Sequence, residues 1–180
     1  MTTDYPWYAI VQNTDEIEQG DVLRSWPVII PEEWIGGTGD VNTDIDEKDM
    51  IIMSQSCDIQ HNKIDNALVC PLWDIDKLGK YTSAGDRNKL KKGEIIAYHL
   101  LNKCDLADLS ECGLSELTGK YLAVDFRNAY SIPLRFLKDG VEARGEKRLR
   151  LLPPYKEHLS QAFARFIMRV GLPKEIPDFV

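Results

Sequence analysis

The sequence has few of the features that mark membrane proteins, secreted scaffolds or metalloproteins. No apolar run approaches the roughly 20 residues that cross a bilayer, and the first residues lack the basic stretch and apolar core of a signal peptide. The chain has only four cysteines and no Cys-x-x-Cys pair, so a disulfide framework is not expected. We therefore expect a cytoplasmic protein with free thiols and no membrane association.

The motifs of several common enzyme classes are also missing. The sequence has no glycine-rich phosphate loop after a strand, no Gly-x-Ser-x-Gly elbow and no His-Glu-x-x-His. Zinc would have to use Cys57, His61 and Cys70, which lack the paired spacing and the fourth ligand of a structural site. We predict no metal and no cofactor.

What the chain does have is enough apolar material for one domain, with an uneven charge. It has 180 residues, of which 43% are hydrophobic and 28% charged. Residues 1–126 contain 11 Lys+Arg against 23 Asp+Glu, whereas residues 127–180 contain 11 against 6. The basic C-terminal third presents a positive face to nucleic acid or to an acidic protein, or its cations pair with the protein's own carboxylates.

Two short apolar runs, at residues 50–53 and 67–71, bracket a polar loop at residues 54–62. Apolar runs of this length, bounded by polar residues, are typical of buried strands. We predict that the two runs are neighbouring strands, so that the loop displays its side chains at the strand ends.

Further strands are expected on both sides of this pair. Residues 7–35 and 121–134 have strand composition, and an acidic, glycine-opened loop is predicted at residues 36–48. Residues 74–120 are predicted to be an insertion, because they are rich in lysine, aspartate and glycine. Within it, residues 95–101 fit either a buried strand or a short helix. Pro27 and Pro31 indicate an edge strand or a bend.

The clearest element is a helix at residues 154–171 in this single domain of residues 1–180. Pro153 and Pro154 precede its start, and Gly171 marks its end. Its apolar residues fall on one face at three- and four-residue spacing, as in a helix packed on a core or on a partner: Leu159, Ala162, Phe163, Phe166, Ile167 and Val170. Two arginines beside this face contact an anion or simply face solvent: Arg165 and Arg169.

The order of elements resembles that of the MazF/PemK plasmid toxins, which are small SH3-like barrels that cleave RNA. Four segments are similar to parts of that family: Gln19–Leu23, Met50–Ser54, Val69–Leu72, and Tyr121–Leu137 with the following helix. The resemblance implies a mainly β (α+β) fold, an SH3-like β-barrel with an inserted segment and a C-terminal amphipathic helix. It also implies a toxin–antitoxin or phage-defence setting, with a homodimer as an open alternative.

The chemistry of this family uses an arginine just before the second of these strands and a serine or threonine closing the third. Here Lys48 or Asp49 takes the first position, and Trp73 or Asp74 takes the second. Lysine lacks the bidentate fork that grips phosphate, and aspartate repels it. We therefore expect a non-catalytic component that binds nucleic acid or protein.

The alternatives are an endoribonuclease with relocated catalytic groups, or a cysteine hydrolase. The candidate catalytic residues are Lys48, Ser54, Ser56, Cys57 and His61. A nucleophilic cysteine needs a base and oxyanion donors, and a neighbouring carboxylate, here Asp58, is not a group that favours a thiolate. The plainer interpretation is that the polar side chains of this loop bond the backbone at a strand end.

A ligand is expected between the loop at residues 54–62 and the basic segment at residues 127–150. Aromatic and guanidinium groups interleave in that segment, as they do on single-strand-binding surfaces, and glycines predict a mobile turn at residues 138–148. The predicted ligand is RNA or an acidic protein partner. The predicted binding residues are Ser54, Ser56, Asp58, Arg127, Tyr130, Arg135, Arg165 and Arg169.

Overall fold

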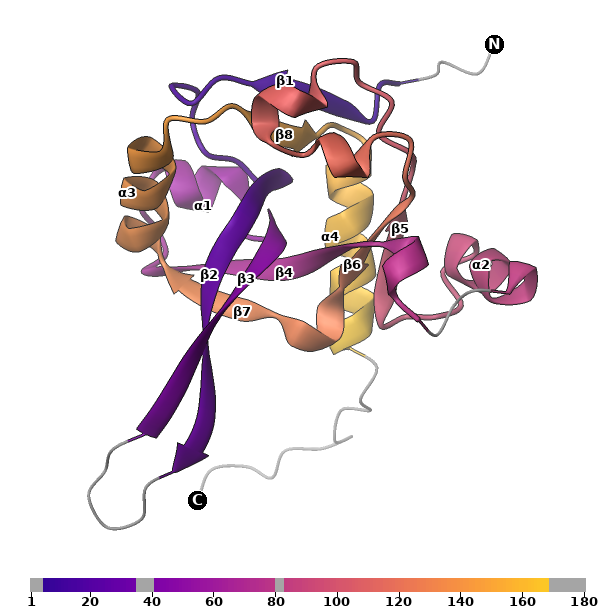
Figure 1. Cartoon of the computed structure of the whole chain (residues 1–180), viewed down its shortest axis with the longest axis horizontal. Coiled ribbons are helices and arrows are strands. Elements are labelled where there is room, and N and C mark those ends of the chain that lie inside the picture. Colours follow the sequence, from indigo (N-terminus) through magenta and orange to yellow (C-terminus); the bar gives the residue numbers. More distant parts are fainter. Residues whose placement is uncertain (1–4, 35–40, 80–82, 169–180) are drawn as a thin grey trace, which may run out of the picture.

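A computed structural model describes residues 5–34, 41–79 and 83–168 (Figure 1). The strands are β1 (Tyr8–Val11), β2 (Asp21–Trp34), β3 (Val41–Ile52), β4 (Asn66–Asp74), β5 (Tyr98–Leu101), β6 (Leu122–Asp125), β7 (Tyr130–Pro133) and β8 (Arg148–Leu151). The helices are α1 (Ser56–Gln60), α2 (Ala84–Lys91), α3 (Leu134–Arg144) and α4 (Tyr155–Ile167). Short 3₁₀ helices are η1 (Ile75–Lys77), η2 (Leu109–Cys112), η3 (Ser115–Leu117) and η4 (Phe126–Asn128).

The strands form one eight-stranded sheet in the order β1-β8-β2-β3-β4-β6-β5, with β7 paired to β4. All strand pairs are antiparallel. This confirms the mainly β (α+β) class. Over the described residues the two ends of the order, β1 and β5, are not paired with each other, so the sheet is not closed. None of the described helices has the length and apolar composition to span a bilayer.

The two apolar runs are confirmed as neighbouring strands. Met50 pairs with Pro71, and Ile52 pairs with Val69. The side chains of Met50, Ile51 and Ile52 are fully buried, because both faces of the sheet are covered here. Beyond the ladder, the Met53 amide donates to the Leu68 carbonyl at 2.8 Å. This pairing brings the residues that flank the two runs to common ends of the sheet.

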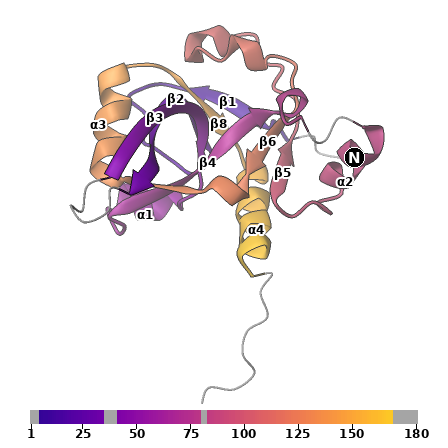
Figure 2. The same cartoon turned by 60° about the horizontal axis from the view of Figure 1, so that its bottom comes forward.

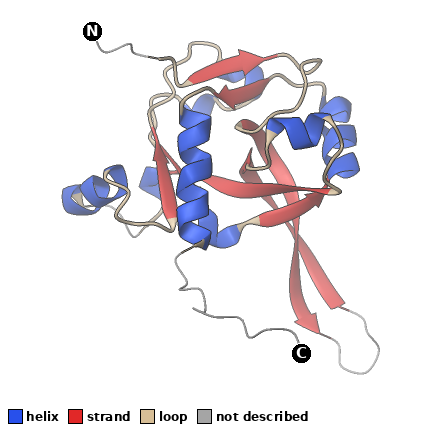
Figure 3. Ribbon diagram, turned by 180° about the vertical axis from the view of Figure 1, so that it is seen from behind, coloured by secondary structure: helices blue, strands red, loops and turns tan. Residues whose placement is uncertain are grey.

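Alternation along these strands divides the core between the two faces of the sheet. Ile51 of β3 packs in the cluster that includes α4, whereas Met50 and Ile52 pack in the cluster that includes α3. In Figures 2 and 3, α3 and α4 accordingly stand apart, on different sides of the body. The Phe126 ring anchors α4, at 5.3 Å between ring centroids from Phe163.

The predicted C-terminal helix is confirmed as α4. It begins directly after Pro154, and Leu159, Ala162 and Phe166 are buried on the expected face. The last described helical residue is Ile167, and the predicted end at 171 lies outside the described residues. Ile167, predicted on the same face, is 58% exposed, so the first part of the face serves the core and Ile167 does not.

The hairpin of β2 and β3 extends beyond the body as a two-stranded arm (Figure 1). In the arm the strands pair only with each other, for example at Ile29 and Ile45, which are 65% and 64% exposed. Beyond Val22, β2 pairs only with β3, and Pro27 and Pro31 lie in this stretch, so the predicted edge position is confirmed. The acidic loop predicted at 36–48 is wrong from Val41 onward, where β3 begins; residues 35–40 lie outside the described part.

Three other predictions are changed by the structure. The polar loop at 54–62 contains the short helix α1, and the mobile turn predicted at 138–148 is largely helix α3. Gly145 ends α3 in the left-handed conformation, with φ 63°. Residues 95–101 contain strand β5, so the segment predicted as an insertion contributes a terminal strand to the sheet.

Candidate functional site

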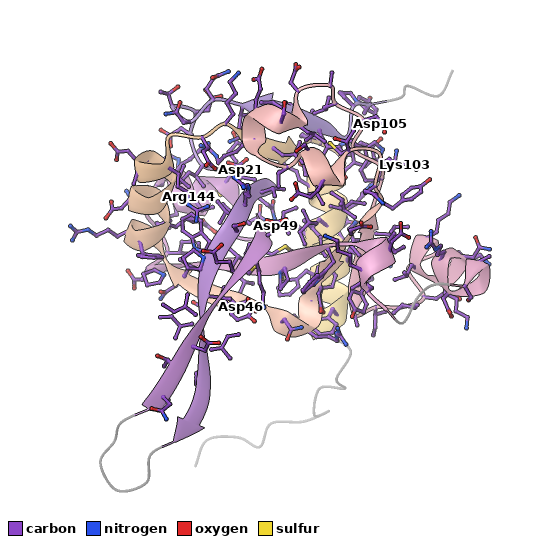
Figure 4. All side chains as sticks on the ribbon, in the orientation of Figure 1. Asp21, Asp46, Asp49, Lys103, Asp105 and Arg144 are labelled. Atoms are coloured by element: carbon purple, nitrogen blue, oxygen red, sulfur yellow. The ribbon has the colours of Figure 1, made fainter. Side chains whose placement is uncertain are left out.

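A groove lies where the paired part of β3 and β4 ends and the arm begins. We call it the strand-end groove, and its volume is about 360 Å³. Figure 4 labels two of its carboxylates, Asp46 and Asp49, along β3. Its lining residues are Ser25, Asp46, Glu47, Lys48, Asp49, Leu72, Trp73, Lys77 and Glu116.

The groove collects the positions at which the resemblance places the catalytic groups of the toxin family. The β3–β4 ladder ends at the pair of Met50 and Pro71. The residues just before Met50 and just after Pro71 therefore lie at the same end of the ladder. Lys48, Asp49 and Trp73 all line the groove. Asp74 is instead buried, and its side chain accepts the Asp76 amide at 2.9 Å.

Asp49 is a partly buried carboxyl of the groove whose pKa is raised. Its Oδ1 accepts the backbone N–H of Ser25 at 2.9 Å. Burial raises the pKa of Asp49, and the nearby Glu116 carboxylate adds to the rise, while the Ser25 amide, Arg24 and Lys77 oppose it. Asp49 therefore keeps a proton to a higher pH than an ordinary aspartate.

Lys48 does not supply a free positive charge. Its ammonium donates to the Asp46 carboxylate, and this hydrogen bond lowers the pKa of Asp46. The groove as a whole contains four carboxylates and only two ammonium groups. Such a lining attracts cations and repels phosphate.

Trp73 gives the groove an aromatic wall. Within the described part of the chain, its buried indole Nε1 has no hydrogen-bond partner. An aromatic face next to carboxylates is the arrangement that binds ammonium or guanidinium groups.

Ser54 and Ser56 hold backbone groups at the strand ends. The Ser54 hydroxyl accepts the Leu68 amide at 2.8 Å, and the Ser56 hydroxyl accepts the Gln19 amide at 3.2 Å. Ser56 also donates to Glu18 over 3.5 Å. These contacts agree with the plainer interpretation of the loop, in which its side chains complete the backbone hydrogen bonding.

Cys57 is exposed at the start of α1. Its thiol donates to the Asp58 carboxylate at 3.6 Å, and the contact between His61 and Cys57 runs from the His61 backbone N–H to the Cys57 carbonyl. The other three cysteines are buried, and all four are free, as predicted. Burial raises the pKa of the Cys112 thiol to about 11.

The predicted basic binding segment is largely occupied by contacts within the chain. Arg127 donates from Nε to Asp125 at 2.9 Å and lies over the Tyr98 ring at 4.6 Å. Arg144 donates to the Ser25 carbonyl at 2.9 Å and covers the Trp26 ring. Arg135 is exposed, with Asp139 at 3.6 Å.

The remaining predicted binding residues are scattered over the molecule. Tyr130 packs against the core cluster on the α3 side, Asp58 lies in α1, and Arg165 is exposed on α4. Arg169 lies outside the described residues. The Ser54 hydroxyl bonds Leu68 and the Ser56 hydroxyl bonds Gln19, whereas Arg127 bonds Asp125.

A buried charge network fixes the start of β2 to β8. Asp21 is fully buried and accepts from Arg148 Nε at 3.1 Å and from Arg150 Nη2 at 3.0 Å. Arg150 also contacts Glu18 at 2.8 Å, and Lys156 of α4 contacts the same carboxylate at 3.2 Å. Both arginines donate further to backbone carbonyls, so the network is closely satisfied by protein atoms.

Of the nine lining residues, only Lys48, Asp49 and Trp73 were expected from the sequence, and the others include Ser25 and Glu116. Ser25 reaches it from β2, beside a bulge between Leu23 and Trp26 in the β2–β3 ladder. Glu116 reaches it from η3, far along the chain. No local pattern marks either residue, because each depends on the path of the chain between distant elements.

Neither a search for metal-binding groups nor a comparison with known proteins assigns a function to the groove. Over the described residues, no group of three or more histidine, cysteine, aspartate or glutamate side chains is arranged to hold a metal ion. Comparison with protein-family models, with curated proteins and with solved structures finds no match. The function is therefore argued from the site itself.

Proposed function

We propose that this chain is a non-catalytic binding protein whose strand-end groove takes a lysine or arginine side chain from a basic segment of a protein partner. The observation that carries the proposal is the lining of the groove. Four carboxylates face two ammonium groups, Lys48 is already paired with Asp46, and Trp73 supplies an aromatic wall. Carboxylates and an aromatic face together favour a cationic guest.

The same lining disfavours RNA in this groove. A phosphate near an unpaired carboxylate loses roughly 1 to 4 kcal/mol, depending on how strongly solvent screens the pair. The arginines at 127, 144, 148 and 150 are engaged by the protein's own oxygens. We therefore propose a basic protein partner in place of the RNA or acidic protein expected from the sequence.

We further propose that the sheet is a distant variant of the SH3-like barrel, acting in the cytoplasm in a toxin–antitoxin or phage-defence setting. This setting rests on the resemblance to the MazF/PemK toxins. Two observations support the kinship: the runs at 50–52 and 69–71 pair antiparallel, and Lys48, Asp49 and Trp73 converge on one groove.

Peptide binding tests the proposed ligand. Fluorescence anisotropy would compare an arginine-rich peptide with its glutamate counterpart, on the wild type and on the double variant Asp49→Asn/Glu116→Gln. We expect the basic peptide to bind and the double variant to weaken it about tenfold. Asp139→Asn removes an exposed carboxylate outside the groove and serves as the matched control. Tighter binding of the acidic peptide, or equal effects of both variants, would overturn the proposal.

The alternative is an endoribonuclease that works from this groove. The observation in its favour is Asp49, a carboxyl whose burial raises its pKa toward the range of a general acid or base, next to Lys48. The purified protein, incubated with a mixed RNA ladder without metal, would decide the matter. Cleavage that Asp49→Asn and Lys48→Ala both abolish would replace the binding proposal, whereas an intact ladder at high protein concentration would end the enzyme hypothesis.

A further inference from the structure

A second and larger cavity lies between α2, β5 and the start of β6, away from the strand-end groove. We call it the α2–β5 cavity, and its volume is about 440 Å³. A neighbouring cavity of about 260 Å³ adjoins it, since Ile75, Arg87 and Tyr121 line both. Sites for small organic ligands have volumes of about 300 to 1,000 Å³. The space is therefore sufficient for a small organic molecule.

The wall of the cavity is aromatic and apolar on one side. Leu101 and Ile75 are buried, Trp7 and Tyr121 also line the cavity, and the Lys103 ammonium lies over the Tyr121 ring at 5.2 Å. Trp7 is held in place because it stacks on Tyr155 with ring centroids 3.5 Å apart. A fixed indole beside a partly exposed phenol is a surface on which a planar ring stacks.

The other side of the cavity is positively charged. Arg87 and Lys91 project from α2, and Lys103 and Lys120 line the adjoining cavity. Asp76 is the one carboxylate in the two linings, and it accepts from Arg87 Nη2 at 2.5 Å. A chain with a net charge of −7 thus has four cations around one pair of cavities, of which Arg87 and Lys120 pair with Asp76.

Several polar groups here are left for a ligand. In the described part of the chain, the Lys91 ammonium and the side-chain amide of Asn88 have no hydrogen-bond partner. Within the described residues the Arg87 Nε is buried without a partner, whereas Nη2 of the same guanidinium donates to Asp76. Amides recognise the polar edge of a base or the hydroxyls of a sugar.

We propose that the α2–β5 cavity binds a nucleoside monophosphate group. The base stacks at Trp7 and Tyr121, and the phosphate is held by Lys91 and Arg87. The combination of a flat aromatic wall, cations and amides matches the three parts of this ligand. The group comes either from a free nucleotide or from the 5′-phosphorylated end of an RNA strand.

Calorimetric titration of the full chain tests the proposal with AMP, GMP, CMP and UMP as probes. We expect at least one of them to saturate a single site. The nucleoside without its phosphate, and inorganic phosphate alone, should each bind at least about tenfold more weakly than that nucleotide. Lys91→Ala is expected to weaken the nucleotide about tenfold, while Lys89→Ala, on the same helix but outside the lining, changes it less than about twofold.

The source of the group is decided by a 5′-phosphorylated RNA hexamer. Tighter binding of the hexamer than of the mononucleotide assigns the cavity to strand ends, and weaker binding assigns it to free nucleotides. Failure of all four mononucleotides to bind at millimolar concentration, or equal effects of Lys91→Ala and Lys89→Ala, would overturn the proposal. Asp49→Asn in the strand-end groove is expected to leave nucleotide binding unchanged, so the two proposals fail independently.

Discussion

Asp21 has more consequence for the fold than any other single carboxylate described here. It is fully buried, and two arginines of β8 converge on it, with Arg148 Nε at 3.1 Å and Arg150 Nη2 at 3.0 Å. A buried ion pair contributes little compared with an apolar replacement, but removing one partner leaves an uncompensated charge inside the protein.

Asp21→Asn is therefore expected to lower the free energy of unfolding by about 3 to 5 kcal/mol, because it leaves two cations in the interior without their shared anion. Urea unfolding followed by circular dichroism measures the change. The control is Asp139→Asn, which removes an exposed partner of Arg135 at 3.6 Å and should cost less than about 0.5 kcal/mol. Equal losses in the two variants would contradict the role given to the buried network.

Asp49 predicts a pH dependence of stability. Its pKa lies above the ordinary value of 3.8, so the folded state binds the proton more tightly than the unfolded state. The stability that this group contributes is complete below pH 3.8 and is lost as the pH rises through the folded-state pKa. Asp49→Asn has no such loss, because asparagine stays neutral and its oxygen still accepts the Ser25 amide.

We expect the stability of Asp49→Asn relative to the wild type to increase as the pH rises from below 3.8 toward neutrality. Unfolding by urea at a series of pH values gives this difference directly. A difference that does not change with pH would show that the carboxyl titrates normally in the folded protein. The basic peptide proposed for the groove should bind more tightly over the same rise in pH, since the ionised carboxylate attracts it.

At the scale of elements, the two helical glycines of α2 and α3 behave differently. A Cβ on Gly140 would lie 2.5 Å from Cη2 of Trp26, a ring that is 2% exposed and closely packed. A Cβ on Gly85 would have its nearest neighbour at 3.7 Å, the Ser83 hydroxyl. Gly140 is thus required by packing, whereas Gly85 only lowers helix propensity.

Gly140→Ala is expected to destabilise the protein by about 1 to 2 kcal/mol, because overpacking against Trp26 exceeds the gain in helix propensity. Gly85→Ala should stabilise it by about 0.5 kcal/mol. Thermal unfolding of the two variants measures both effects in one series. A higher melting temperature for both variants would mean that the Trp26 side chain moves to accommodate the added methyl group without loss of stability.

Elements with a strong local pattern were predictable from the sequence. The strands around Ile51 and Cys70 were found because apolar runs mark strands buried on both faces, and α4 was found because its apolar residues recur every three or four positions. Strand β3 was missed from Val41 to Lys48 because the segment is acidic and follows a run of glycines, although Val41, Thr43 and Ile45 alternate with polar residues. Helix α3 was missed because Gly140 indicates a turn until its contact with Trp26 is known.

The candidate site was predictable only in part. The strand-end positions Lys48, Asp49 and Trp73 followed from the resemblance, but Glu116 comes from η3, and only the folded chain brings it to the groove. The basic segment was harder to interpret, because its arginines bind oxygens that are mostly distant in sequence. Arg127 and Arg135 are exceptions, since their partners Asp125 and Asp139 are two and four positions away.

The whole molecule combines a body built on both faces of the sheet with an arm that is solvated on both sides. Strand β3 belongs to both parts, with Ile45 exposed in the arm and Met50 to Ile52 fully buried in the body. The body is therefore expected to resist local opening more than the arm does, because buried apolar contacts add to the hydrogen bonds between the strands.

Amide hydrogen exchange should therefore change along this one strand. We expect hydrogen-bonded amides of β3 between Asp44 and Glu47 to exchange at least about a hundredfold faster than those between Met50 and Ile52. Exchange followed by nuclear magnetic resonance resolves the two groups. Equal protection along β3 would mean that the arm opens only together with the body.

The position of β8 between β1 and β2 has a consequence during synthesis. Leu151 pairs with Tyr8, and Leu149 pairs with Val22. Strands β1 and β2 therefore pair with β8, the last of the described strands along the chain. A nascent chain leaving the ribosome cannot complete its sheet until the codons for Arg148 to Leu151 have been read. Contacts of such high contact order form slowly, and a stop codon anywhere before that point would release a polypeptide in which β1 has lost the strand that joins it to β2.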